Sequence, residues 1–259
     1  MYSVTTFCYG NKYSPIRTKW VERIQNKCLQ AEIKIYENVN QYLKNGFDYA
    51  WWDIVRMTNN LELSLETQKP VVQVDMDIII EKDIQPLVDL NYDFIVSTEI
   101  GGNKAYPSEC SKQLGFGICT GFYVIKPTAH AFLSKILSFM NDKKYNNYSD
   151  QVTIMNYIVE KSNKMTLEEI TFDGITYSNK IIEIDGIRIC VLDFELITRD
   201  PILTKGQFAN HINVDNVGGT MNFLRYFDEP LENLPLTCRC GKTHLGDHTI
   251  CPHIDLRNK

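Results

Sequence analysis

The chain has 259 residues, of which 44% are hydrophobic and 23% charged, as expected of a soluble globular protein with one sizeable core. Its net charge of −5 argues against a general affinity for nucleic acid or anionic membrane surfaces. No run approaches the roughly 18 apolar residues of a membrane span, and the N-terminus lacks a secretory pattern. We therefore expect a cytoplasmic protein whose eight cysteines are reduced thiols.

Strand and helix patterns alternate along the chain, as a sheet with helices on its faces requires. The first half predicts strands at 3–8, 31–36, 94–96 and 121–125, and helices at 16–28 and from 47 to about 60. The second half predicts helices at 128–141 and 150–161 and strands at 166–171, 181–185 and 188–192. Residues 101–117 are polar and glycine-rich and are expected to form a loop over the site. The fold class is therefore α/β.

The run from Val71 to Ile80 contains two carboxylates, Asp75 and Asp77, and is otherwise almost wholly apolar. Such a run is typical of a buried strand, and an unpaired buried charge is costly. Alternate residues of a strand share a face, so both acids can reach one ion if the strand ends between them. Mg²⁺ and Mn²⁺ take oxygen ligands and leave positions for substrate phosphates. The pattern predicts a metal site suited to a diphosphate, although an isolated Asp-x-Asp is usually a turn or a solvated face.

Five segments follow one another in the order of a known family. They are Thr5-Thr6-Phe7-Cys8-Tyr9-Gly10, Asp75-Met76-Asp77, Gly121-Phe122-Tyr123-Val124-Ile125-Lys126-Pro127-Thr128, Asp150-Gln151 and His211-Ile212-Asn213. In these segments the chain, over residues 3–226, resembles the metal-dependent glycosyltransferases of GT-A fold, which use nucleotide-diphospho-sugars. The resemblance implies a GT-A (Rossmann-like) domain at 1–230 with a mixed central sheet. It also implies a hexosyl- or pentosyltransferase that moves a sugar from a UDP- or GDP-sugar to a glycan or protein acceptor. Residues 231–259 are expected to form a separate, Cys/His-rich tail.

The resemblance also implies a role for each matching residue. Asp77 is implied as the main ligand of Mn²⁺ or Mg²⁺, Asp75 as a ligand that also binds the ribose, and His211 as the residue that completes the shell. Asp150 and Gln151 are implied to face the donor sugar and the acceptor hydroxyl, in positioning or in catalysis. The implied donor-binding residues are Thr6, Phe7, Tyr9, Arg56, Asp75 and Gly121.

Simpler interpretations stand beside these roles. His211 alone would be a satisfied polar residue, and Asp150 a helix N-cap. Arg56 would be a solvated side chain, and Tyr9 a packed aromatic rather than a base-stacking one. Cys119-Thr120 stand where many retaining relatives have Asn or a small residue, so stereochemistry stays open, with retention favoured.

The C-terminal segment concentrates the two residue types that zinc prefers, thiolate and imidazole. Within sixteen positions lie Cys238, Cys240, His244, His248, Cys251 and His253. A structural zinc site needs four such ligands in a tetrahedral array, so any four of the six would suffice. The spacing is not that of a standard zinc finger, and the alternative is a flexible tail with reactive thiols.

Two other functions remain open from the sequence. A sugar nucleotidyltransferase would also use carboxylates and metal, but such enzymes usually place a Gly-rich, basic loop after the first strand. Residues 9–14 contain one glycine, which disfavours that function. The other alternative is a non-catalytic, transferase-like protein whose tail binds a partner.

Overall fold

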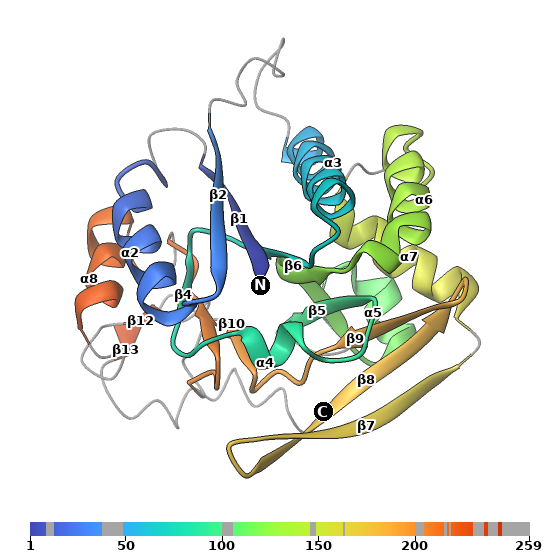
Figure 1. Ribbon diagram of the computed structural model, residues 1–259. Helices are drawn as coiled ribbons and strands as arrows, with labels where there is room; N and C mark the ends of the chain where they lie inside the picture. The colour runs from blue at the N-terminus through green and yellow to red at the C-terminus, as the bar shows by residue number, and fades with distance from the viewer. Residues whose placement is uncertain are drawn as a thin grey trace.

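A mixed sheet of eight strands forms the centre of the computed structural model (Figure 1). Its strands are β1 (Tyr2–Cys8), β2 (Ala31–Glu37), β3 (Val71–Val74), β5 (Phe94–Glu99), β6 (Gly117–Ile125), β7 (Met165–Phe172), β8 (Ile175–Ile184) and β9 (Ile187–Val191). They lie in the order β2-β1-β3-β6-β5-β9-β8-β7. Strand β1 is parallel to β2 and β3, whereas β6 runs antiparallel to both of its neighbours, β3 and β5. The predicted α/β class with a mixed sheet is confirmed.

The structure describes residues 1–8, 13–37, 49–99, 106–145, 149–162, 164–199, 205–214, 217, 219–229, 236–237 and 243–244. Its helices are α2 (Arg17–Lys27), α3 (Tyr49–Thr67), α4 (Gln85–Val88), α5 (Ser108–Leu114), α6 (His130–Asn141), α7 (Asp150–Lys161) and α8 (Thr220–Asp228), with a 3₁₀ turn at Pro127–Ala129. Helices α2 and α8 lie on one side of the sheet, and α3, α6 and α7 on the other (Figure 1). The protein is therefore a layered sheet with helices on both faces.

Two hydrophobic cores follow from the alternation of side chains along the central strands. On β6, Phe122 and Val124 pack with the α2 side, whereas Tyr123 and Ile125 pack with the α3, α6 and α7 side. All four are fully buried. A strand buried on both faces reads as a continuous apolar run, which is why β3 and β6 were recognisable in the sequence.

A second sheet of three strands lies beside the first. Its strands are β4 (Ile78–Ile80), β10 (Ile197–Arg199) and β11 (Ala209–His211), in the order β10-β11-β4. Strand β11 is antiparallel to β4, with His211 opposite Ile78. This pairing brings a segment from late in the chain next to the end of β3. A further strand pair joins β12 (Leu236–Thr237) to β13 (Thr243–His244).

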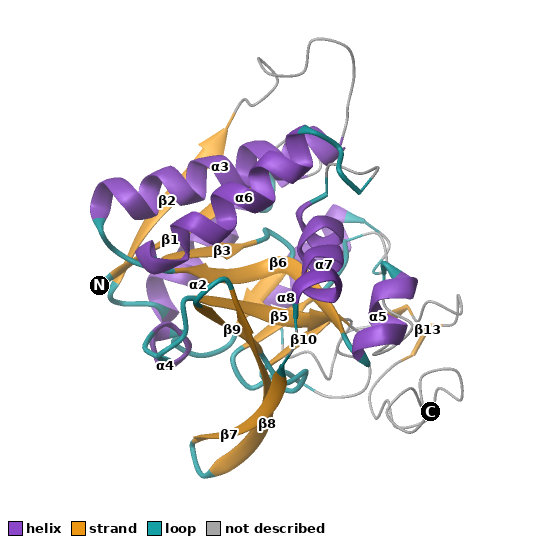
Figure 2. Cartoon of the chain, turned by 90° about the vertical axis from the view of Figure 1, so that its right-hand side faces the viewer, coloured by secondary structure: helices purple, strands orange, loops and turns teal. Residues whose placement is uncertain are grey.

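Three sequence expectations need correction. Helix α3 does not stop near residue 60, because Asn60 is buried and donates to Gln73 Oε1 at 3.0 Å and Tyr123 Oη at 2.9 Å. A helix, α5, occupies part of the segment expected to be a loop. The predicted strand at 181–185 begins six residues earlier, since β8 pairs with β7 in a long hairpin that extends away from the helical layers (Figure 2).

Among the described residues, no helix is both long and apolar enough to cross a membrane. The described cysteines Cys8, Cys28, Cys110, Cys119 and Cys190 are all free thiols.

Candidate active site

Asp75 and Asp77 lie in a turn between two strands of different sheets, rather than on one continuous strand. β3 ends at Val74, which still pairs with Phe122, and β4 begins at Ile78. The turn is closed by a 3.0 Å hydrogen bond from Ile78 N to Asp75 O. The expectation of a single strand through the pair is therefore corrected. The acids converge because the chain turns after Val74, so the strand ends before both acids rather than between them.

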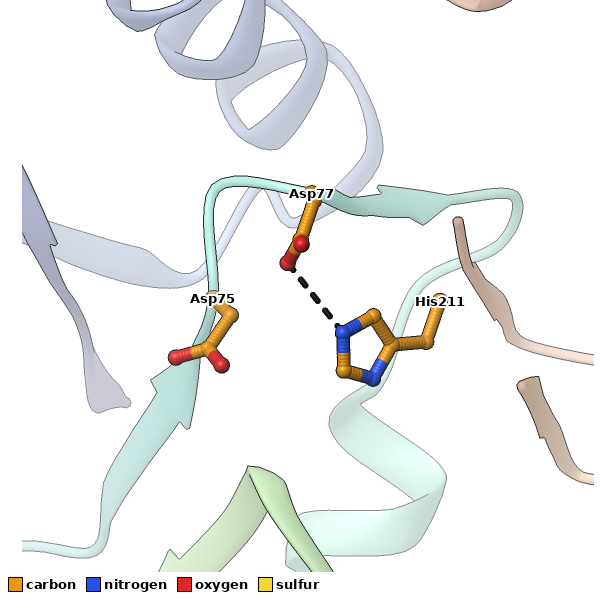
Figure 3. A group of neighbouring side chains, drawn as sticks. All are labelled: Asp75, Asp77 and His211. Atoms are coloured by element: carbon orange, nitrogen blue, oxygen red, sulfur yellow. Dashed lines mark ion pairs between the residues drawn. The ribbon is translucent and has the colours of Figure 1, made fainter. Parts of the chain in front are cut away.

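His211 comes to the same point from β11. Its Nε2 lies 3.2 Å from Asp77 Oδ1, and ligand atoms of Asp75, Asp77 and His211 all lie within 4.8 Å of one another. Figure 3 shows the two carboxylates and the imidazole directed toward one space. His211 and Asp77 are buried. The three residues that the resemblance implied as metal ligands are thus brought together from two sheets.

The electrostatics of this group reflect burial and close opposite charge. Burial, reinforced by the neighbouring Asp77, raises the pKa of Asp75 above its ordinary value, although Arg56 opposes the shift. Burial alone would lower the pKa of His211, but Asp77 and then Cys119 hold it well above its ordinary value. Two oxygen ligands and one imidazole are a donor set that Mn²⁺ and Mg²⁺ accept. The residues present therefore fit a divalent cation.

Gly121 gives this group the room it needs. A Cβ at that position would lie 2.8 Å from His211 Cε1 and 3.0 Å from Asp75 Oδ2. Contacts under about 3 Å are not tolerated by a side-chain carbon, so any larger residue would push the two side chains apart. The sequence prediction assigned Gly121 to donor binding, and the structure places it against the side chains of Asp75 and His211.

Arg56 is the cationic centre of a second cluster, beside the first. It is buried on α3 and contacts Asp150 Oδ2 at 2.6 Å, Asp53 Oδ1 at 3.1 Å and Asp75 Oδ1 at 3.3 Å. Burial would lower the pKa of Arg56, but these carboxylates raise it well above its ordinary value. Burial and the nearby Asp150 also raise the pKa of Asp53 to about 8. Arg56 is therefore not a solvated side chain.

Asp150 is fully buried at the first position of α7, and Ser149 is the N-cap residue. Its Oδ1 accepts hydrogen bonds from Thr120 Oγ1 at 2.8 Å and from Gln151 N at 2.6 Å. Gln151 lines the cavity and donates through Nε2 to Tyr106 O at 2.6 Å. Asp150 is thus held by Arg56 and Thr120, which the simpler helix-cap interpretation does not explain.

The buried side-chain amide of Gln73 orients the carboxylate of Asp75. Gln73 Nε2 donates to Asp75 Oδ1 at 3.0 Å, and Gln73 Oε1 accepts from Asn60 Nδ2 at 3.0 Å. Thr5 Oγ1 adds a third contact to Gln73, at 3.3 Å. Gln73, Asn60 and Thr5 are all buried, so the network fixes one orientation of the Asp75 carboxylate.

The two clusters line a cavity of about 250 Å³. One wall is aromatic: Phe7, Tyr13 and Trp52 line it, and Phe7 stacks on Tyr36 with ring centroids 4.6 Å apart. Phe7 is one of the predicted donor-binding residues, and it lines this wall. Its neighbour Thr6 was also predicted to bind the donor, but its side chain is fully buried, because alternate strand residues point to opposite faces. Tyr9 lies outside the described residues.

Several cavity residues were not found from the sequence. They are Tyr13, Trp52, Asp53, Cys119, Ser149 and Arg199. Asp53 was within reach of sequence reasoning, because it lies one helical turn before Arg56 and is its ion-pair partner. Arg199 was not, because β10 has only three residues and shows no periodicity.

Of the predicted zinc ligands, Cys238, Cys240, His248, Cys251 and His253 lie outside the described residues. His244 belongs to β13, and the structure describes only its backbone.

Two carboxylates and an imidazole that could hold a metal ion, at the end of a central strand and over a cavity with an aromatic wall, are typical of the class of GT-A-like, nucleotide-sugar-dependent enzymes. The sequence profile of the nucleotide-diphospho-sugar transferases matches residues 13–220. The chain belongs to this family.

The fold is also similar to a solved structure described as a glycosyltransferase involved in the glycosylation of the major capsid of PBCV-1. The two share 14% sequence identity with a TM-score of 0.58, and the match covers 88% of this chain and 98% of the other. At that identity the likeness concerns the fold. No curated protein is significantly similar to the chain in sequence.

Proposed function

We propose that the protein transfers a hexose or pentose from a UDP- or GDP-sugar to a hydroxyl of a glycan or protein, and that the reaction requires Mn²⁺ or Mg²⁺. The observation that carries this proposal is the convergence of Asp75, Asp77 and His211 over the cavity. The catalytic unit would be residues 1–230. The tail at 231–259 would be a separate module that binds a structural Zn²⁺ ion.

The proposed chemistry explains why acids and a metal belong together here. When the glycosidic bond breaks, the nucleoside diphosphate gains negative charge, and a divalent cation supplies positive charge where it develops. Asp77 and His211 would hold that cation, and Asp75 would hold it together with the ribose. Because Gln73 and Gly121 fix the position of Asp75, little reorganisation would be needed during the reaction.

The second cluster would position the sugar. Arg56 and Asp150 form a rigid pair behind the cavity, and Gln151 lines it directly. The aromatic wall of Phe7, Tyr13 and Trp52 offers a surface on which a nucleobase can stack.

Retention of the anomeric configuration is the outcome that we favour. Inversion needs a base near the acceptor hydroxyl. The cavity-lining carboxylate that is not a proposed metal ligand is, among the described residues, Asp53. Its Oδ1 lies 3.1 Å from Arg56 Nη2, so the guanidinium already occupies the carboxylate oxygen that a base would use. This supports a mechanism that does not depend on such a base.

The test is a screen of sugar nucleotides for Mn²⁺-dependent hydrolysis without acceptor, run on the wild type, Asp77→Ala and Asp228→Ala. Asp228 is a matched control because its side chain is 57% exposed, pairs with Lys19 and does not line the cavity. We expect Asp77→Ala to fold and to lose turnover by about 10²-fold or more, and Asp228→Ala to retain it. Retained turnover in Asp77→Ala would contradict the proposal. Pyrophosphate release from a nucleoside triphosphate and a sugar phosphate would instead indicate a nucleotidyltransferase, and nucleotide binding without turnover a non-catalytic protein.

A further inference from the structure

The imidazole of His211 is held from both edges. On the edge that faces the cavity, Nε2 lies 3.2 Å from Asp77 Oδ1 (Figure 3). On the opposite edge, Nδ1 lies 3.5 Å from the thiol sulfur of Cys119. Both side chains are buried, with Cys119 4% exposed. A sulfur therefore occupies the position behind a proposed metal ligand, where a carboxylate or a backbone carbonyl is the usual partner.

An irregularity in the sheet directs Cys119 to this position. Along β5 and β6 the register changes between Val96, which pairs with Tyr123, and Ser97, which pairs with Cys119. The extra residues on β6 include Thr120 and Gly121, both of which line the cavity. Bulges of this kind re-aim side chains beside functional sites. The backbone oxygen of Cys119 accepts a 2.8 Å hydrogen bond from Ser97 Oγ, which stabilises the new register.

The guanidinium of Arg199 also contacts the sulfur of Cys119. Arg199 Nη1 lies 3.7 Å from Cys119 Sγ and forms an ion pair with the buried Glu99. Arg199 on β10 is the register partner of His211 on β11, so both arrive from the small sheet. Arginine has donors and no acceptor, so the contact from Arg199 makes the sulfur an acceptor. The sulfur is then also suited to accept a hydrogen bond from Nδ1–H of His211.

The position of the imidazole proton decides which nitrogen can bind a metal. A neutral imidazole carries its proton on one nitrogen and a lone pair on the other. We infer that Cys119 is a positioning residue, which accepts Nδ1–H of His211 and so directs the Nε2 lone pair toward Asp75 and Asp77, where the divalent cation would be bound. This inference rests on the metal site of the proposed function. Partners of this kind change metal affinity by about 10- to 100-fold.

The test measures Mn²⁺ binding to the protein without nucleotide, by calorimetry or by the electron paramagnetic resonance signal of free Mn²⁺. The variants are Cys119→Ala, Cys119→Val, which fills the space without an acceptor, and Cys119→Ser, which restores an acceptor. Cys190→Ala is the control, since that thiol is also fully buried but lies on β9 rather than on β6. We expect Cys119→Ala and Cys119→Val each to weaken binding by about tenfold or more, Cys119→Ser to recover most of the loss, and Cys190→Ala to bind as the wild type does.

Two further measurements separate positioning from packing. In a His211→Ala background, Cys119→Val should weaken Mn²⁺ binding no further, because its partner is absent. The ¹⁵N shifts of His211 in the Mg²⁺-bound protein, assigned by their loss in His211→Ala, should show the proton on Nδ1 in the wild type and a changed tautomer population in Cys119→Val. If Cys119→Ala does not fold, Cys119→Val and Cys119→Ser still give the comparison.

The outcomes distinguish this inference from the proposal on which it rests. If the wild type binds no Mn²⁺, or if His211→Ala binds it as tightly as the wild type, the proposed metal site fails. If His211→Ala weakens binding but both Cys119→Val and Cys119→Ala bind Mn²⁺ with wild-type affinity, the metal site stands and the role of Cys119 is overturned. An equal loss from Cys119→Val with and without His211 would also overturn it.

Discussion

Arg56 on α3 donates a 2.6 Å hydrogen bond to Asp150, the first residue of α7, and so joins the two helices behind the cavity. The same guanidinium contacts Asp75 at 3.3 Å. One buried cation thus couples the acid that opens α7 to the acid that opens the turn after β3. Any donor sugar bound between these elements would meet a fixed arrangement of charge rather than a mobile one.

Removal of Arg56 should therefore be costly. Arg56→Met leaves the carboxylate of Asp150 buried without its cation, and the loss of one partner of a buried pair costs about 3–5 kcal/mol of unfolding free energy. Urea denaturation measures the change. Arg225→Ala is the control, because its ion pair with Glu229 is exposed at 46% and 39% of the two side chains, and such pairs contribute about 0–1 kcal/mol. Equal stability of Arg56→Met and the wild type would show that the cluster is not a structural unit.

A methyl group at position 121 should weaken metal binding more than it weakens the fold. In Gly121→Ala the new carbon would meet His211 and Asp75 at 3.0 Å or less, so these side chains must move apart. We expect the affinity for Mn²⁺ to fall by about tenfold or more, as when the support of a ligand is lost.

Gly174→Ala provides the opposite pattern. Nothing lies within 4 Å of its added carbon, but its φ of 80° disfavours a side chain. It should lose about 1 kcal/mol of stability and keep its Mn²⁺ affinity. Calorimetric titration and thermal unfolding of both variants make the comparison. Tight Mn²⁺ binding by Gly121→Ala would place the metal elsewhere.

Asp53 should make the stability of the metal-free protein fall as pH rises. Burial, Asp150 and Asp75 raise its pKa to about 8, with Arg56 opposing, so the folded state keeps a proton that the unfolded state releases well below that pH. The stabilisation is complete in acid and is lost as pH rises through 8. Asp53→Asn mimics the protonated form and removes this dependence.

Thermal unfolding between pH 5 and about pH 9 tests this prediction. Near pH 9, the free energy of unfolding of Asp53→Asn should exceed that of the wild type by on the order of 1–2 kcal/mol more than it does at pH 5. This difference is equivalent to a few degrees in Tm. Asp228→Asn, whose carboxylate is 57% exposed beside Lys19, is the control. Parallel profiles for the wild type and Asp53→Asn would contradict the assignment of the raised pKa to Asp53.

The central strands and the principal helices could be predicted from the sequence because their side chains report burial directly. Residues 71–74, 94–96 and 121–125, within β3, β5 and β6, are almost wholly apolar on both faces, and the stripe from Ile16 to Cys28 has helical spacing. The end of α3 was misjudged because Asn60 is polar in type, although tertiary hydrogen bonds to Gln73 and Tyr123 satisfy it inside the protein. Local sequence does not record such partners.

The candidate site was predictable only in part for a similar reason. The resemblance named Asp75, Asp77 and His211, and the structure brings them within 4.8 Å of one another. The contacts that hold them come from elements without a sequence signal. Arg199 lies on a three-residue strand, and Cys119 faces His211 only because the register of β6 changes at that point. Neither arrangement follows from periodicity.

The most direct measurement is a crystal structure with Mn²⁺ and a nucleoside diphosphate, with data collected at the manganese absorption edge. The proposed function predicts one anomalous peak at coordination distance from Asp75, Asp77 and His211, with the diphosphate beside it and the base against the aromatic wall of Phe7, Tyr13 and Trp52. An anomalous peak elsewhere, or a nucleotide bound away from these residues, would contradict it.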